Sequence, residues 1–226
     1  MASKDFRFST DFQKFEVTSG NSQQGRVRDD WDNWFGNNNS SSLFGYPMHT
    51  HYRNRNPHIF LPADRVYIPT GKEPERIYPT SELETRFNRP SHYNRVTSGC
   101  GPGIHRDSEV GAQYYGDAFI CEPVHSVVRR LVLKPNGPVF TGHRAPDEKT
   151  SEFLSSSDNW FRPAQAKTGP DGAIWVVDMH RGLIEHPRWV PEDRLKQMPA
   201  ESIASCQAAN ACVPSPISVI SLRPSW

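Results

Sequence analysis

The stretch Asp29–Trp34 places three acids, one asparagine and two tryptophans within six residues. These side chains cannot all be buried, and an exposed pair of tryptophan rings is costly without a partner. Tryptophan faces stack on the C–H surfaces of sugars, and Asp and Asn side chains hydrogen-bond to hydroxyl groups. We therefore predict that Trp31, Asn33 and Trp34 contact a carbohydrate or polyol. Packing against a neighbouring blade that is missing from this chain explains the same residues almost as well.

Three further groups of side chains are suited to binding or catalysis. Arginines bind carboxylates bidentately, carboxylates hold Ca²⁺ through oxygen, and histidines exchange protons near neutral pH. The candidates are the cations Arg26, Arg28, Arg162 and Arg181, the metal-ligand candidates Asp29, Asp30, Glu122 and Asp178, the candidate bases His58, His125 and His186, and the further ligand-contacting ring of Trp160.

Several of these residues also have a structural interpretation. A buried His125, hydrogen-bonded to a backbone carbonyl, is slightly favoured over a catalytic one. His186 precedes a proline, which favours an extended backbone and a role in ending a strand. Trp160 would be a core aromatic, with Arg162 in a structural ion pair. The segment Gly169–Gly172 is typical of a hairpin turn rather than of a metal-binding loop.

Composition favours short strands over long helices. The chain has 20 prolines and 15 glycines in 226 residues, and both residue types interrupt helices and central strands. Its 26 basic and 25 acidic residues are interspersed, which argues against the one-signed basic surface of a nucleic-acid-binding protein. No stretch approaches the ~20 apolar residues of a transmembrane helix.

Three segments have the pattern of a β-hairpin, in which apolar strands flank a polar, Pro- or Gly-containing turn. Because such units recur without helical periodicity, the blades of a β-propeller, at roughly 40–50 residues each, are the repeat that fits best. A β-sandwich is the alternative. The segments are residues 5–18 with a turn at 9–11, residues 127–141 with a turn at 134–137, and residues 168–178 with a turn at 168–172.

Irregular stretches separate these hairpins. Residues 19–60 contain an Asn/Ser run and are expected to form a long loop, and residues 69–90 are expected to form a surface excursion. From about residue 199, Ala, Ser, Pro and Cys dominate and the pattern matches no upstream unit. We therefore predict a propeller domain over residues 1–198 and an irregular tail, 199–226, outside the fold.

Eight motifs along residues 5–198 together resemble one known family. They are Gly25–Gly36, Arg55–His58, Arg86–Asn88, Ser98–Pro102, Ala118–His125, Asp158–Pro163, Gly169–Ala173 and Asp178–Pro187. In this order they resemble the propeller of the PVC-type membrane-bound dehydrogenases, exported bacterial proteins distantly similar to quinoprotein glucose/sorbosone dehydrogenases. The resemblance implies an all-β fold, the C-terminal part of a propeller of the six-bladed type, with long irregular loops. It also implies a periplasmic or exported parent protein that oxidises a sugar or polyol.

The resemblance further implies pyrroloquinoline quinone and Ca²⁺ as cofactors. In such a site the arginines would hold the carboxylates of the quinone, the acids would hold Ca²⁺, and His125 or His186 would take the hydroxyl proton. A c-type cytochrome domain of the parent protein would be the electron-transfer partner, although this chain has no CxxCH haem motif.

Three departures from the family keep two alternatives open. Earlier blades and the haem segment are absent, and the unit after Arg194 does not continue as a strand. The segment Met1–Asp5 also lacks the apolar core of a signal peptide, which taken literally indicates a cytoplasmic protein. The alternatives are a non-catalytic propeller that binds glycan or a partner domain, and a gene fragment without independent activity.

The four cysteines form two pairs by position, Cys100 with Cys121 and Cys206 with Cys212. Neither pair has CxxC spacing. In an exported protein, a disulfide between Cys100 and Cys121 on neighbouring strands is plausible. Two buried free thiols fit the sequence about equally well.

Overall fold

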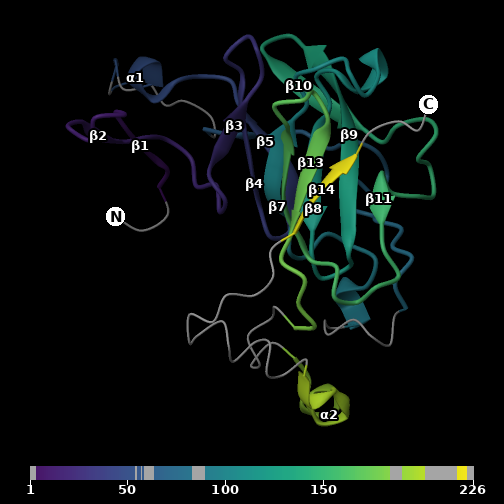
Figure 1. Ribbon diagram of the computed structural model, residues 1–226. Helices are drawn as coiled ribbons and strands as arrows, with labels where there is room; N and C mark the ends of the chain where they lie inside the picture. The colour runs from purple at the N-terminus through teal and green to yellow at the C-terminus, as the bar shows by residue number, and fades with distance from the viewer. Residues whose placement is uncertain are drawn as a thin grey trace.

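The structure, a computed structural model, describes residues 4–53, 55, 56, 58, 64–82, 90–183, 190–201 and 218–222 (Figure 1). Short antiparallel strands dominate these residues, and the two α-helices are α1 (Thr50–Arg53) and α2 (Glu192–Gln197). Neither is long and apolar enough to cross a membrane. The sheets are open, so the fold is all-β with a partial, propeller-like arrangement, which confirms the predicted fold class.

Two consecutive up-and-down sheets form the centre of the molecule. The first has the strand order β3-β4-β5-β6, and the second has the order β10-β9-β8-β7, with β11 also paired to β9. Four-stranded sheets of consecutive strands are the blade unit of a propeller. The strands are β3 (Arg26–Arg28), β4 (Trp34–Asn38), β5 (Ser41–Tyr46), β6 (Val66–Tyr67), β7 (Cys100–Ile104), β8 (Ala118–Glu122), β9 (Val127–Asn136), β10 (Val139–His143) and β11 (Leu154–Ser155).

Two smaller sheets complete the fold. The hairpin of β1 (Phe6–Phe8) and β2 (Phe15–Val17) stands beside β3, and a three-stranded sheet joins β12 (Pro163–Thr168), β13 (Ile174–Asp178) and β14 (Ser218–Leu222) (Figure 1). All three predicted hairpins are therefore present. The loop between β9 and β10 is shorter than expected, because Asn136 pairs directly with Val139.

Strand β8 shows how the sheets are stacked. Ile120 and Ala118 belong to the core shared with the β3–β6 sheet, and the alternate residues Phe119 and Cys121 belong to the core shared with the β12–β14 sheet. Successive side chains of a strand point to opposite faces, so β8 is apolar throughout because both of its faces are covered. At Gly103 an added Cβ would meet the Ala166 carbonyl of β12, so the absence of a side chain permits this close packing.

The expectation of loops at residues 19–60 and 69–90 is wrong in part. The first range contains β3, β4 and β5, and its Asn/Ser run forms the end of β4, a tight turn and the start of β5, where Asn38 pairs with Ser41. Asn and Ser have low strand propensity, but the alternate residues Phe35 and Leu43 are fully buried, and this burial decides the conformation. In the second range, Ile77 is fully buried rather than exposed.

The tail also differs from its expectation at residues 218–222. These residues form β14 and pair with β13 along its whole length, from Ile174 opposite Leu222 to Asp178 opposite Ser218. Without β14 this side of β13 would present unpaired backbone groups, and an apolar, β-branched segment is well suited to pair with such an edge. Ile220 and Leu222 pack against the core. Residues 202–217 and 223–226, with Cys206 and Cys212, lie outside the described residues.

Candidate ligand-binding cleft

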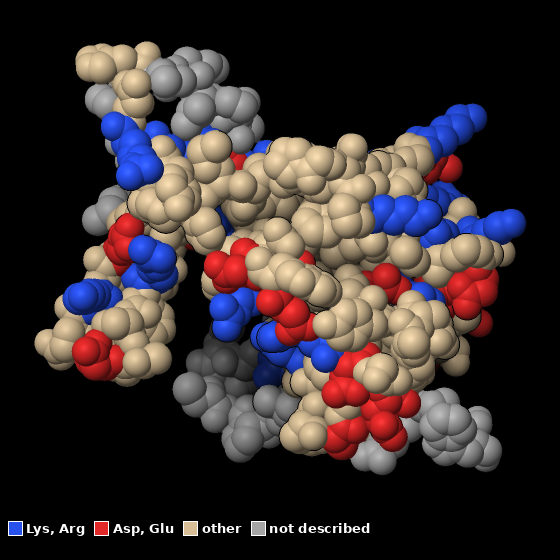
Figure 2. Space-filling model, turned by 90° about the horizontal axis from the view of Figure 1, so that it is seen from above, with Lys and Arg blue, Asp and Glu red and all other residues tan. Residues whose placement is uncertain are grey.

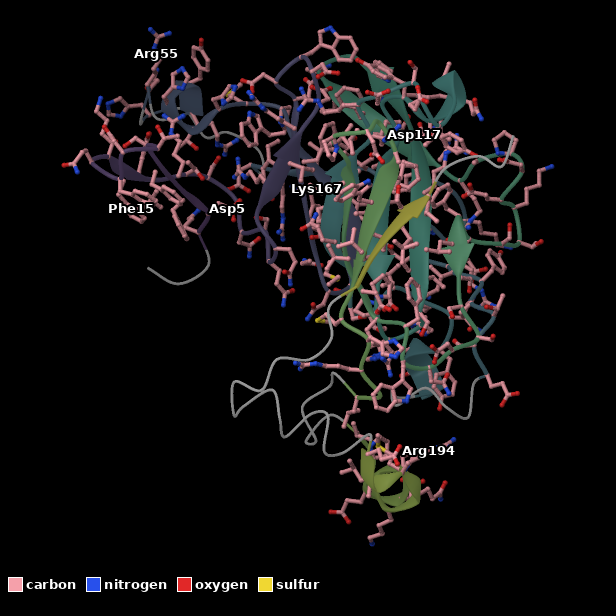
Figure 3. All side chains as sticks on the ribbon, in the orientation of Figure 1. Asp5, Phe15, Arg55, Asp117, Lys167 and Arg194 are labelled. Carbon is pink, nitrogen blue, oxygen red and sulfur yellow. The ribbon has the colours of Figure 1, made fainter. Side chains whose placement is uncertain are left out.

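A cleft of about 490 Å³ lies between the N-terminal hairpin, the β3–β6 sheet and the segment that contains α1. Arg7 and Glu16 line it from the hairpin, and Arg26 and Trp34 line it from the sheet. In Figure 3 the labelled Asp5 lies between the hairpin and the sheet, immediately before β1. Side chains near residue 4 and side chains near residue 51 therefore line the same cleft.

Strand register explains why aromatic and cationic side chains share this wall. Arg28 is opposite Trp34, which is in turn opposite Tyr46, so the three side chains project from the same face of the sheet. The Arg26 guanidinium lies 3.7 Å from the centroid of the Tyr46 ring, and the Arg28 guanidinium lies 6.0 Å from that of Trp34. These distances fit cation–π contacts. The opposite face of the sheet carries the core residue Phe35.

The cations around the cleft are already paired with acids. Arg26 Nε lies 2.7 Å from Asp5, and Arg28 Nη1 lies 3.3 Å from Asp32. On the hairpin, Arg7 Nη2 lies 2.6 Å from Glu16. Paired charges of this kind create little net field, so the cleft is better suited to a neutral polar ligand than to an anion such as a phosphate. Figure 2 likewise shows acidic and basic side chains interspersed on one face of the molecule.

His49 also lines the cleft, and sequence reasoning did not select it. Its Nε2 atom lies 3.7 Å from Asp32 Oδ2, and both side chains are about half exposed. A histidine oriented by a carboxylate can hydrogen-bond to a ligand hydroxyl or accept its proton. Only the fold brings His49, which follows β5, to the turn before β4, so no local sequence signal identified this pair.

Two polar atoms buried within the β3–β6 sheet have no hydrogen-bond partner among the described residues. They are the indole Nε1 of Trp34 and the hydroxyl of Tyr46. Burial raises the pKa of the Tyr46 hydroxyl above its usual value, so the phenol remains protonated and can donate a hydrogen bond. Both atoms are buried, and Tyr46 is not among the residues that line the cleft, so neither atom is exposed to a ligand there.

The other residues predicted from Asp29–Trp34 do not line the cleft. Asp29 is buried and accepts hydrogen bonds from the backbone N–H groups of Trp31 and Asn33, at 2.9 Å each, and from the Asn33 side chain. Asp29 therefore holds its own turn together. The local geometry then turns Trp34 into the cleft and leaves Trp31 outside it, 70% exposed.

Asp30 lies on a separate surface with Trp31. It accepts a hydrogen bond of 2.6 Å from the Tyr115 hydroxyl and another from Arg106, and these two contacts lower the pKa of the Asp30 carboxyl. The Trp31 ring meets the edge of Tyr115, with ring centroids 6.4 Å apart. Asp30 thus links the loop before β4 to the segment before β8.

Glu122 and His125 form a buried network. Glu122 Oε1 accepts four hydrogen bonds, from the backbone and hydroxyl groups of Thr97 and Ser98, and Oε2 accepts two from His125, through its N and Nδ1 atoms. His125 Nε2 accepts the N–H of Asn94 at 3.1 Å. His125 is fully buried, so this geometry favours a structural role over catalysis. The expected carbonyl partner is replaced by a carboxylate and a backbone amide.

Arg162 is enclosed by backbone carbonyls. Its guanidinium donates to the carbonyls of Pro123 at 2.7 Å, Gly182 at 2.7 Å and Arg181 at 3.0 Å. Asp178 Oδ1 accepts the backbone N–H of Arg162, at 2.7 Å, and that of His180, at 2.9 Å. Arg162 therefore holds three chain segments together, and the geometry favours a structural role over cofactor binding.

The residues predicted for a quinone and Ca²⁺ thus do not converge on one site. Glu122 and Asp178 are occupied by local donors, and Asp29 and Asp30 serve two different turns. No cluster of His, Cys, Asp and Glu in the described residues has the geometry of a metal site. Trp160 lies 5.7 Å from the ring of His180, beside Arg181, and His58 is exposed. His186 lies outside the described residues.

Cys100 and Cys121 are opposite each other on β7 and β8, as expected for neighbouring strands. Both are free thiols in the structure. Burial raises the pKa of Cys100 to about 12 and that of Cys121 well above its usual value. The geometry therefore gives a buried Cys121 thiol and a partly buried Cys100 thiol, both packed in the core cluster of Phe119 and both of low reactivity because their pKa values are raised.

The fold and the cleft define a partial, propeller-like β domain with a polar, aromatic-walled cleft beside its first four-stranded sheet. A family model described as a domain of unknown function (DUF7133) matches residues 1–208, so the chain belongs to that family. No curated protein and no solved structure matches the chain significantly.

Proposed function

We propose that this chain is a propeller-type domain that binds a neutral sugar or polyol in the cleft between the N-terminal hairpin and the β3–β6 sheet. One observation carries the proposal. Trp34, beside charges that are already paired, lies in the same cleft as His49 and Asp32. An aromatic face with hydrogen-bonding groups at its edge is the chemistry that a ring of C–H and O–H groups requires.

Each wall has a distinct part in this binding. The Trp34 ring packs against the C–H face of the ligand, and Asp32 and His49 hydrogen-bond to its hydroxyl groups. Arg26 remains paired with Asp5 and keeps the hairpin against the sheet. The ligand then meets a site whose charges are balanced before it binds, which favours neutral ligands over anionic ones.

Binding of glucose and sorbitol, measured by isothermal titration calorimetry, tests this proposal. Trp34→Ala is expected to weaken binding by about tenfold or more, because truncation of a central aromatic typically costs more than 1 kcal/mol. Trp160→Ala is the matched control, because Trp160 lies beside His180 and does not line the cleft. The Trp160→Ala variant should bind glucose and sorbitol with the affinity of the wild type. Equal losses of affinity in Trp34→Ala and Trp160→Ala, or no binding by the wild-type chain, would contradict the proposal.

Oxidation of the bound polyol by an exogenous quinone-type electron acceptor, which would take the hydride while His49 takes the hydroxyl proton, is a second candidate function, favoured by the contact between His49 and Asp32. Asp32 would stabilise the imidazolium that forms when His49 takes the proton of a ligand hydroxyl. The residues predicted to hold pyrroloquinoline quinone and Ca²⁺ do not fit that group, because their side chains are separated and engaged elsewhere. The dehydrogenase activity, the cytochrome partner and the periplasmic location therefore stay predictions from the resemblance.

Thermal unfolding with and without pyrroloquinoline quinone plus Ca²⁺ tests the cofactor. A group that binds the native state adds about 2.7 kcal/mol to the free energy of unfolding at a hundredfold excess over Kd, and this raises the unfolding midpoint. Because the predicted residues do not converge, we expect no shift with the cofactor and an upward shift with sorbitol. A shift with the quinone and Ca²⁺ would make the dehydrogenase the primary function and would require a site made of other residues than those predicted.

A further inference from the structure

The N-terminal hairpin has one face made of exposed aromatic rings. The register of β1 and β2 pairs Phe8 with Phe15 and Phe6 with Val17, so these four side chains share a face. Phe6, Phe8 and Phe15 are 60%, 54% and 64% exposed. Phe12 in the turn is 75% exposed and stacks on Phe8, with centroids 5.1 Å apart. We call Phe6, Phe8, Phe12 and Phe15 together the Phe face.

The opposite face of the same hairpin is charged. Arg7 and Glu16 are cross-strand partners on that face and form an ion pair. The hairpin is thus amphipathic, and among the described residues its apolar side is the more exposed one. In Figure 3 the labelled Phe15 lies at the outer side of the molecule, away from the stacked sheets. The rings touch one another but belong to none of the core clusters.

A two-stranded hairpin needs additional packing to be stable in water, because by itself it buries too little apolar area. The charged face of this hairpin has such support. Asp5 pairs with Arg26 and accepts hydrogen bonds from Ser22, while Glu16 lines the cleft. Phe6 also lines the cleft, but Phe8, Phe12 and Phe15 have no such support among the described residues. The Phe face is the exposed apolar patch that a partner would cover.

We infer that the Phe face is the contact surface of a homodimer, in which a second copy of this chain packs its own Phe face against it around a two-fold axis. With roughly 150–250 Å² per phenylalanine, the exposed fractions correspond to about 500 Å² on each copy. A pair then buries on the order of 1,000 Å², which is about the lower bound for a specific interface. The face is self-complementary, because rings that meet rings leave no charge unpaired.

Charge favours a second copy over a lipid surface. The ionised side chains at the edges of the hairpin are Lys4, Arg7 and Lys14 against Asp5, Asp11 and Glu16, so cations and anions are balanced. Peripheral attachment to anionic membranes depends on an excess of Lys and Arg around the apolar anchor. A purely apolar face with neutral surroundings is instead suited to packing against an equally neutral aromatic face.

Sedimentation velocity of the full chain over a concentration series tests the dimer. The wild-type chain should move from monomer to dimer as its concentration rises. The double variant Phe8→Ser/Phe15→Ser should raise the dimer Kd at least about a hundredfold, because each buried ring is worth about tenfold or more. Exchange of Arg7 and Glu16, as Arg7→Glu/Glu16→Arg, keeps an ion pair on the opposite face and should leave the dimer unchanged. Circular dichroism checks that each variant folds.

Three results would overturn the inference. The first is a wild-type chain that stays monomeric at every concentration. The second is a dimer that persists equally in Phe8→Ser/Phe15→Ser, which would place the contact elsewhere. The third is a monomer that floats with phosphatidylcholine vesicles through the Phe face, which would identify a lipid surface as the partner. If the double variant is unfolded, the same series with Phe12→Ser decides, because Phe12 lies in the turn and is 75% exposed.

Discussion

Replacement of Arg162 by leucine is expected to lower the free energy of unfolding by about 3–5 kcal/mol, the cost of breaking a buried ionic or charge-assisted network. The guanidinium donates to carbonyls at Pro123, Arg181 and Gly182, and the residue is only 2% exposed. Leucine fills part of the volume but donates nothing. The carbonyls would therefore be buried without partners, which costs about 1–3 kcal/mol each.

Urea denaturation followed by tryptophan fluorescence measures this effect. Arg162→Lys should fall between the wild type and Arg162→Leu, because one ammonium group cannot reproduce the planar fork that reaches several carbonyls. Arg28→Leu is the control, since Arg28 is an exposed arginine whose ion pair with Asp32 is worth at most about 1 kcal/mol. If Arg162→Leu and Arg28→Leu lose the same stability, the carbonyl enclosure is not what holds these segments together.

Arg162 also shows where the sequence stops being informative. The motif Trp160–Pro163 marked the residue as important, and the family resemblance suggested cofactor binding. Its partners lie in segments about 20 and 40 positions away, which the pairing of β12 with β13 and the packing of β12 against β8 bring near. The type of a residue limits the chemistry it can do, but the partners that occupy it are set by long-range structure.

The fold could be predicted further than the site. Hairpins at 5–18, 127–141 and 168–178 were recognisable because turn residues and apolar strands are adjacent in sequence. The strands β4 and β5 were missed because Asn and Ser have low strand propensity, and in this sheet burial of Phe35 and Leu43 decides the conformation. Strand β14 was missed for a related reason, because its pairing partner β13 lies about 40 residues earlier.

The candidate site was predicted only where it is local. Trp34 and Arg26 were selected, and both line the cleft, because the β3–β4 hairpin places them on one face. His49 was not selected, because it reaches Asp32 only through the return of β5. Asp29 was selected as a ligand but caps its own turn, and a short Asp-x-x-x-Asn spacing is compatible with either role.

Glu122 is expected to make the stability of the chain depend on pH in the acid range. Burial would by itself raise the pKa of Glu122, but His125 and the donors of Thr97 and Ser98 outweigh it and hold the pKa at about 2, against an ordinary value of 4.5. A carboxyl with a lower pKa in the folded state stabilises the fold above its unfolded pKa. That stabilisation, on the order of 3 kcal/mol, should be lost as the pH falls from about 4.5 to about 2.

Glu122→Gln is expected to remove this acid dependence and to cost about 3 kcal/mol at pH 7, because an amide cannot accept all the hydrogen bonds that the carboxylate accepts. Unfolding free energies measured between pH 2 and 7 give both the acid dependence and the loss of stability at pH 7.

Glu148→Gln is the matched control, because the contribution of Glu148 to stability depends on pH in the opposite direction. Burial raises the pKa of Glu148 to about 7, so its contribution is fully present below about pH 4.5 and is lost as the pH rises through 7. Glu148→Gln should therefore flatten the neutral range and leave the acid range intact. An acid transition that survives in Glu122→Gln would show that another carboxyl controls it.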